Sequence, residues 1–235
     1  MQPLYEEVKK KITESLIQGE WKPGEVIPSE VELACKYNVS QGTVRKAIDE
    51  LSAESILIRR QGKGTYVATH NEENIQLRFL RLTSNLGLKE KLDNQLVAFS
   101  KEKATNKLAK ILNINPASTI LSLKRILTFN EKPLILDVIK IPAQSFRGLT
   151  AEMVVQKKGS MYRMYETDFG VRMLRADEKI KAISANFDAA SLLNVKENSP
   201  LLSVERLSYT YDNKPLEWRL GLCITDNHYY RSELD

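Results

Sequence analysis

The sequence predicts an α+β protein with two domains, a winged helix-turn-helix domain followed by an antiparallel-sheet domain. Between Pro28 and Val67, two short amphipathic segments flank a tight turn, and two β-prone runs follow around a Gly-Lys-Gly tip. Beyond residue 77, strand-like and helical runs mix, and one block of them recurs. The polar, acidic stretch HNEENIQ separates the two parts. The predicted domains are therefore 1–69 and 77–235, joined by a linker at 70–76.

Length and composition limit the class of protein. With 235 residues, 42% of them hydrophobic, the chain can form packed cores, which argues against general disorder. No run reaches the roughly 18 apolar residues that a membrane span requires, and the charged N-terminus lacks the apolar core of a signal peptide. Cys35 and Cys223 lie far apart without metal-ligand spacing. We therefore expect reduced thiols in a cytoplasmic protein.

The net charge of +5 does not mark the N-terminal domain as basic. Residues 1–70 contain ten Lys/Arg and ten Asp/Glu, so this part of the chain is formally neutral. Any cationic surface on the first domain must therefore be local. We expect its acids on one face and its bases on the other.

Three helices are predicted in the first domain. Apolar residues at helical spacing predict the first helix over residues 4–18. Ser29 and Glu32 have the spacing of a capping box at the start of the second helix. Asn38 tolerates the left-handed conformation of the following turn, and Ser40 is placed to cap the third helix. The apolar face of the third helix consists of Val44, Ala47, Ile48 and Leu51.

The opposite face of the third helix carries polar side chains suited to reading DNA in the major groove. Arg45 can donate two hydrogen bonds to guanine, and Gln41 can pair with adenine in the same bidentate way. Hydroxyl groups near helix N-termini, at Ser29, Ser40 and Thr43, can contact phosphates. The alternative is that each of these residues belongs to a solvated helix face with ordinary capping.

A hairpin from residues 56–60 and 65–67 has the position and composition of a wing. Glycines at its tip permit close approach of the backbone to a phosphate, and Lys63 supplies positive charge. A lone Gly-Lys-Gly tip is only a turn, but directly after a helix-turn-helix it indicates a DNA-binding wing. The predicted DNA-contacting residues are Ser29, Glu30, Ser40, Gln41, Thr43, Arg45, Lys46, Arg60, Gln61, Gly62, Lys63 and Gly64.

Several short motifs occur together in this segment: Pro23-Gly24, Pro28-Ser29-Glu30, Leu33-Ala34, Val39-Ser40, Thr43-Val44-Arg45, Ala47, Leu51 and Gly62-Lys63-Gly64. Residues 4–67, which contain them, resemble the winged helix-turn-helix domain of the GntR family of bacterial transcription regulators. Two positions depart from the family pattern. Gln41 stands where the family usually has Arg, and Ser55 stands where it usually has Gly. The first departure should change the operator sequence or weaken a phosphate contact without affecting the fold.

In the second domain the pattern predicts alternating helices and strands. Helices are expected at 104–112, 150–157, 160–169 and 189–194. Strands are expected at 120–129, 134–141, 172–184, 201–211 and 215–225. Two blocks of this pattern recur at an offset of 81 residues, as between Arg125 and Arg206. We infer a pseudo-symmetric domain built from two similar units.

The turns between the predicted strands set their register and bring charged residues together. A turn centred on Glu131 places Arg125 opposite Asp137 within an apolar strip. A turn at Asp212-Asn213 places Arg206 opposite Arg219, and also Ser208 opposite Glu217. Two arginines directly opposite repel each other unless an anion lies between or near them. The alternative is an exposed sheet face or an internal salt bridge.

The second part of the chain also carries a set of motifs: Arg125, Lys132-Pro133-Leu134, Pro142, Gly159-Ser160-Met161-Tyr162, Gly170, Pro200-Leu201-Leu202 and Pro215-Leu216-Glu217. Residues 77–235, which contain them, resemble the UTRA effector-sensing domain of the HutC subfamily, whose fold is similar to chorismate lyase. This resemblance implies effector contacts from Arg125, Asp137, Ser160 and Glu217. The candidate effector-binding residues are Arg125, Asp137, Ser160, Tyr162, Arg206, Glu217 and Arg219.

The departures from the HutC pattern bear on the effector class. Sugar-phosphate sensors of this type often carry a second Arg where this chain has Leu127. They also tend to end in an Arg-Gly-Asp-type strand where this chain has Ile224-Thr225-Asp226. Guanidinium groups bind carboxylates in a bidentate way, so we expect a small carboxylate. A sugar phosphate is the alternative.

The sequence therefore predicts a ligand-responsive transcription regulator, with repression released by the effector as the expected mode. We expect a homodimer on a palindromic operator in double-stranded DNA, with no cofactor, no metal and no membrane partner. Two alternatives remain: a C-terminal domain that only dimerises, and an enzyme on a lyase-like fold. The sequence contains no nucleophile–base pair and no metal-ligand spacing, and His70 and His228 are isolated. We predict no catalytic residues.

Overall fold

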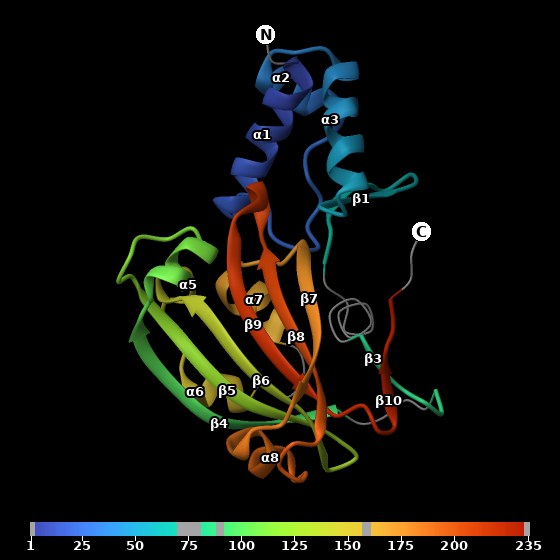
Figure 1. The fold of residues 1–235 in the computed structure, drawn as a ribbon. Coiled ribbons are helices and arrows are strands. Elements are labelled where there is room, and N and C mark those ends of the chain that lie inside the picture. Colours follow the sequence, from blue (N-terminus) through green and yellow to red (C-terminus); the bar gives the residue numbers. More distant parts are fainter. Residues whose placement is uncertain (1–2, 70–80, 88–91, 157–160, 233–235) are drawn as a thin grey trace. The chain divides into compact units, whose positions relative to one another are not determined.

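In the computed structural model the chain divides into two compact units, Met1–Asn71 and Glu72–Asp235 (Figure 1). The structure describes residues 3–69, 81–87, 92–156 and 161–232. The predicted linker at 70–76 lies outside these residues. No helix in the described ranges is long and apolar enough to cross a membrane.

The first unit is a winged helix-turn-helix, as predicted. Its elements are α1 (Leu4–Ile17), α2 (Glu30–Tyr37), α3 (Gln41–Ala53), β1 (Leu57–Arg60) and β2 (Gly64–Val67). The predicted apolar face of α3 is completely buried, together with Leu33 of α2 and Ile12 of α1. Trp21, between α1 and α2, is also buried. A single apolar core therefore holds the three helices together.

Ser55 adopts the left-handed conformation directly after α3, with φ of 57°. Its N–H donates to Ser52 O and the N–H of Ile56 donates to Leu51 O, at 2.9 and 2.8 Å. This pattern is the Schellman motif, in which glycine is the usual residue at the left-handed position. The departure from the family pattern at Ser55 thus leaves the fold intact, but it places a side chain in a conformation that costs free energy.

The second unit is built on a six-stranded antiparallel sheet with the strand order β4-β5-β6-β9-β8-β7. Its strands are β4 (Leu92–Lys103), β5 (Thr119–Phe129), β6 (Lys132–Pro142), β7 (Arg175–Ser184), β8 (Pro200–Tyr209) and β9 (Pro215–Cys223). Its helices are α5 (Asn106–Ile111), η1 (Ala143–Phe146), α6 (Ala151–Gln156), α7 (Met161–Phe169), α8 (Phe187–Leu193) and η2 (Tyr211–Asn213). A two-stranded sheet joins β3 (Leu82–Ser84) to β10 (His228–Tyr230).

The sequence prediction missed β3, β4 and β10. The longest of them, β4, is an edge strand with a bulge between Leu96 and Ala98, and the bulge interrupts the alternation of side chains. The internal repeat was the signal that could have located it. Shifting β7 back by the repeat offset gives residues 94–103, which fall within β4.

The backbone confirms the internal repeat. Thr105 caps α5 as Asn186 caps α8, each with a side-chain oxygen that accepts a backbone N–H. Asn113 and Asn194 end the two helices in the left-handed conformation, with φ of 48° and 55°. The β4-α5-β5-β6 unit and the β7-α8-β8-β9 unit therefore match. They meet at the pairing of β6 with β9.

The sheet has helices on both faces. On one face α8 packs against Ile126 and Leu136, and α5 packs against Ile120; Figure 1 shows these helices toward opposite ends of the sheet. On the other face α6, α7 and η1 pack over Leu123 and Ile139. The β3–β10 pair covers another part of this second face, and the buried pair Arg125 and Asp137 lies on the same face.

Candidate functional site

The predicted recognition surface is held by the caps that the sequence indicated. The Ser29 side chain accepts a hydrogen bond from the N–H of Glu32, while Glu32 accepts from the N–H of Ser29, which completes the capping box. The Ser40 hydroxyl accepts from the N–H of Thr43 at 3.2 Å, and the two hydroxyls lie 2.8 Å apart. Both hydroxyls thus take part in capping as well as being candidates for phosphate contact.

The outward face of α3 carries the predicted side chains. Gln41, Arg45 and Lys46 are exposed and Thr43 is half-buried. The expected separation of acids from bases is wrong at this surface. Glu30, at the start of α2, forms ion pairs with Arg45 and with a residue of the wing, because the helix-turn-helix packs the start of α2 beside α3.

Two members of this cluster, Arg59 and Asp49, were not predicted from the sequence. Arg59 of β1 donates to Glu30 at 2.9 Å and to Asp49 at 2.8 Å. Neither residue was among the predicted DNA contacts. Arg59 lies 29 residues from Glu30 along the chain, so no local spacing links them. Only the packing of the wing against α3 brings them together.

The wing has the predicted hairpin and tip. Arg60 pairs with Gly64 across the turn, and Gln61 and Lys63 are exposed. Gly62 and Gly64 have φ of 70° and 101°, which other residues adopt only with strain. A Cβ atom at Gly64 would also lie 3.3 Å from a methyl group of Val26. The glycines therefore permit the tight tip that carries Lys63.

In the second unit the predicted strand register is confirmed. Arg125 pairs with Asp137 between β5 and β6. Arg206 pairs with Arg219, and Ser208 with Glu217, between β8 and β9. A short turn joins the strands of each pair, which is why the sequence determined this register.

The anions near the opposed arginines are carboxylates of the chain itself, as the alternative of an internal salt bridge predicted. Arg206 Nε donates to Glu178 Oε1 of β7 at 2.7 Å. Arg219 is paired with Glu217 at 3.2 Å, and its Nη1 lies 3.5 Å from Asp137 Oδ2. Glu178 was missed because β7 and β8 are joined through α8, so no short turn indicated their register.

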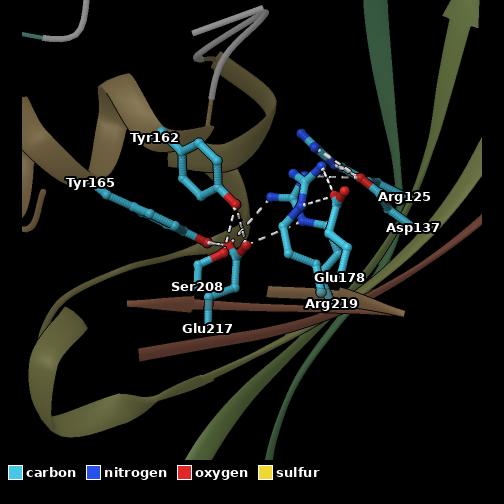
Figure 2. Close-up of polar contacts among 9 residues, drawn as sticks. Arg125, Asp137, Tyr162, Tyr165, Glu178, Ser208, Glu217 and Arg219 are labelled. Atoms are coloured by element: carbon cyan, nitrogen blue, oxygen red, sulfur yellow. Dashed lines mark hydrogen bonds and ion pairs between the residues drawn. The ribbon is translucent and has the colours of Figure 1, made fainter. Parts of the chain in front are cut away.

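A buried network surrounds Glu217, which is fully buried. Tyr162 and Tyr165 of α7 donate to its two carboxylate oxygens at 2.7 and 3.0 Å, and Ser208 lies 3.0 Å from the Tyr162 hydroxyl. Figure 2 shows both tyrosines pointing at Glu217 from the helix. Burial and the nearby Glu217 carboxylate raise the pKa of Tyr162 and of Tyr165. Tyr165 was missed, although it lies one helical turn beyond Tyr162 on the same face.

Arg125 is 3% exposed, and its guanidinium donates through Nε and Nη2 to Asp137 Oδ2, at 3.2 and 2.9 Å. Its Nη1 has no hydrogen-bond partner among the described residues. Figure 2 shows this guanidinium beside Asp137 and close to Arg219. The predicted effector residue Ser160 lies outside the described residues.

A small cavity of about 40 Å³ lies beside this cluster, on the face covered by β3 and β10. Asp137 lines the cavity, and so does the buried thiol of Cys223. Burial raises the pKa of this thiol. The Tyr230 hydroxyl donates to Glu178 at its edge. The residues lining the cavity are Arg81, Leu82, Ile135, Asp137, Val204, Arg206, Arg219, Gly221, Cys223 and Tyr230.

The buried charges of this site balance. Arg125, Arg206 and Arg219 face the three carboxylates of Asp137, Glu178 and Glu217. Alternating donors and acceptors can bind a polar small molecule through several hydrogen bonds at once. Within the described residues, no group of three or more His, Cys, Asp or Glu side chains is arranged to hold a metal ion.

Two family models match the chain. The model "Bacterial regulatory proteins, gntR family" matches residues 4–67, and the model "UTRA domain" matches residues 88–229. Among solved structures, the ligand-binding domain of a GntR-family transcriptional regulator from Bordetella bronchiseptica is 36% identical, with a TM-score of 0.65. That comparison covers 67% of this chain and 98% of the other.

Named relatives match over nearly the whole chain. The fructoselysine utilization operon transcriptional repressor of Escherichia coli K12 is 28% identical, over 92% of this chain and 88% of its own. The mannosyl-D-glycerate transport/metabolism system repressor MngR of the same organism is also 28% identical, over 96% and 93%.

Proposed function

We propose that this chain, which belongs to the GntR family and has a UTRA domain of the HutC type, is a repressor. As a DNA-binding transcription regulator it would be released from its operator when a small carboxylate effector binds. The names of both relatives describe repressors of operons or transport systems, which supports the sign of regulation. DNA and a small molecule are the partners of such regulators, and the chain acts in the cytoplasm.

In this proposal, DNA is bound by the exposed face of α3 and by the wing tip that carries Lys63. A single winged helix-turn-helix reads only a few base pairs, so a homodimer on a palindromic operator supplies the affinity that a specific site needs. The effector must bind more tightly to a dimer with one spacing of its two DNA-binding domains than to a dimer with another spacing. A ligand with equal affinity for both arrangements would not shift the equilibrium between them.

The effector class is inferred from Nη1 of Arg125, which has no hydrogen-bond partner within the described ranges. A buried guanidinium nitrogen without a partner among the described residues costs free energy, and a carboxylate oxygen is the group that best satisfies it. Arg206 is paired with Glu178. Arg219 Nε also lacks a hydrogen-bond partner among the described residues, but it lies 3.2 Å from Glu217 Oε1 in an ion pair, whereas Arg125 Nη1 has no such carboxylate oxygen beside it. We therefore place the effector carboxylate at Arg125.

Asp137 indicates a second feature of the effector. Its Oδ2 accepts from Arg125 and Arg219, whereas none of the described residues donates to its Oδ1. Asp137 lines the cavity, so an effector that fills this space would donate a hydroxyl or amino hydrogen to Oδ1. Glycerate and lysine, which occur in the names of the two relatives, each carry a carboxylate together with such a donor.

Calorimetry of the purified full-length chain tests the effector class. Mannosyl-D-glycerate, fructoselysine and simpler hydroxy- and amino-acids are compared with hexose phosphates. We expect binding by a carboxylate of this set, a raised melting temperature and release from an operator duplex. Arg125→Lys, which keeps the buried charge but loses the forked donor, should fold and lose that response.

Two results would contradict this proposal in different ways. Binding by a hexose phosphate alone would reverse the effector class and leave the regulator in place. A dimer whose melting temperature no metabolite changes would indicate that the second unit only dimerises.

A further inference from the structure

Glu30, the first residue of α2, holds side chains from two other elements. Its Oε2 accepts from Arg45 Nε at 3.0 Å and lies 2.9 Å from Arg45 Nη2, and its Oε1 accepts from Arg59 Nη1 at 2.9 Å. Gln41 Nε2 lies 3.3 Å from Oε2. The Glu30 side chain is 15% exposed and that of Arg45 is 56% exposed. The Glu30 carboxylate is thus the least exposed member of the cluster, and the outer part of Arg45 faces solvent.

The contacts with Glu30 leave one edge of the Arg45 guanidinium group available to DNA. A guanidinium reads guanine through two adjacent N–H groups directed at O6 and N7. The Nε–Nη2 edge of Arg45 is directed at Glu30, so the edge formed by Nη1 and the outer Nη2 hydrogen remains. An exposed arginine otherwise samples many rotamers, and ordering it before binding removes part of that entropic cost.

The same contacts reduce the charge that a phosphate meets. Arg59 Nη2 also donates to Asp49 at 2.8 Å, so two arginines face two carboxylates. Hydrogen bonds from Arg45 lower the pKa of Glu30, which therefore stays ionised at neutral pH. Non-specific binding depends on lysine and arginine charges that neutralise phosphates. In this cluster the arginines are already neutralised by carboxylates.

We propose that Glu30 is a positioning residue for sequence readout: together with Arg59 it fixes the free edge of Arg45 toward the base edges and prevents Arg45 from acting as a general phosphate-binding charge. This inference rests on the DNA-binding function. It assigns to Glu30 and Arg59 the discrimination between operator and other DNA, a role that neither the family match nor the relatives' names contain.

Glu30→Gln in the full-length protein tests the inference, because it keeps the shape of the side chain and removes its charge. The operator is the duplex that the wild-type chain selects from a randomised library. Fluorescence anisotropy measures Kd for this duplex, for a scrambled duplex and for each single base-pair variant, at several salt concentrations. We expect the ratio of the two affinities to fall by about tenfold or more, mainly through tighter binding of scrambled DNA with a steeper salt slope.

Glu7→Gln is the matched control, since it removes one exposed carboxylate from α1 and no contact of this cluster. It should leave the affinity ratio at the wild-type value. In an Arg45→Ala background, Glu30→Gln should cause no further loss of discrimination at the base pair that Arg45 reads. A positioning residue has this dependence on its partner, and a purely structural residue does not.

Arg59→Met covers the case in which Glu30→Gln fails to fold, because it removes the second support without changing α2. It should reproduce the loss of discrimination. An unchanged affinity ratio in a folded Glu30→Gln or Arg59→Met protein would overturn the inference, as would a loss that persists in the Arg45→Ala background. Wild-type protein that binds no duplex in a salt-sensitive way would instead overturn the DNA-binding function itself.

Discussion

Arg125 and Asp137 lie directly opposite each other on β5 and β6, with Nη2 and Oδ2 2.9 Å apart and both residues 3% exposed. Leu127 with Ile135 and Leu123 with Ile139 form the neighbouring pairs of the same face. Burying a charge in such an apolar strip has a large desolvation cost. Each of the two residues is therefore tolerated there only because the other neutralises it.

Asp137→Asn should destabilise the second unit strongly. The substitution leaves Arg125 without its buried counter-charge and removes a contact of Arg219. We expect the free energy of unfolding, measured by urea denaturation, to fall by about 3–5 kcal/mol. Glu102→Gln is the control, because its ion pair with Lys140 is partly exposed and should contribute less than about 1 kcal/mol. Equal losses in the two variants would contradict this account.

Ser55→Gly should stabilise the first unit. Ser55 has φ of 57°, a conformation that costs an L-residue about 1–2 kcal/mol and that glycine adopts freely. The greater freedom of glycine in the unfolded chain offsets part of this gain, so we expect about 0.5–1 kcal/mol in chemical denaturation. Ser52→Gly, within α3, should instead destabilise the unit by about 0.5 kcal/mol, the difference in helix propensity between serine and glycine. A Ser55→Gly protein that is less stable than the wild type would indicate that the serine side chain has a larger role.

Lys63→Ala should weaken binding to every duplex by the same factor. Its position at the wing tip suits contact with phosphate rather than with base edges. The slope of log Kd against log salt should decrease by about 1, with the operator-to-scrambled ratio unchanged. Lys10→Ala, an exposed lysine of α1, is the control and should leave the slope as it is. A loss confined to the operator would show that Lys63 reads sequence.

The buried tyrosines predict a loss of stability in alkaline solution. Burial and Glu217 raise the pKa of Tyr162 and Tyr165, and burial together with Glu178 raises the pKa of Tyr230 to about 12. Above pH 10 the folded state therefore holds protons that the unfolded state releases. Stability that is complete below pH 10 should fall by about 1.4 kcal/mol per pH unit for each fully buried tyrosine.

Phenolate absorbance and circular dichroism, recorded together against pH, test this prediction. Part of the phenolate signal should appear only as the sheet unfolds. Tyr162→Phe should reduce the steepness of the pH dependence. If all nine tyrosines ionised near pH 10 in a folded protein, the network around Glu217 would not be present.

Thiol titration should distinguish the two cysteines. Cys35 is exposed, whereas Cys223 is buried beside the cavity and burial raises its pKa. A disulfide reagent such as Ellman's should therefore react with one thiol in the native protein and with both in urea. Cys35→Ser should react only after unfolding. Rapid reaction of Cys223 in the native protein would mean that the cavity opens.

Local patterns predicted much of the fold. The capping box at Ser29 and the left-handed Asn38 defined the helix-turn-helix, and the short turns defined which residues face Arg125 and Arg206. Such features depend on residues a few positions apart, so their spacing is readable in the chain. The bulged edge strand β4 was missed because its alternation is broken.

Local patterns in the chain were enough to indicate the two kinds of domain, the exposed face of α3, and the pairing of Arg125 with Asp137. The contacts of Glu30 with Arg45 and Arg59, and of Glu178 with Arg206, became visible only once the elements were packed together. The reason is physical. A carboxylate and a guanidinium attract each other through space, so their partners are chosen by the packing of elements that are distant along the chain.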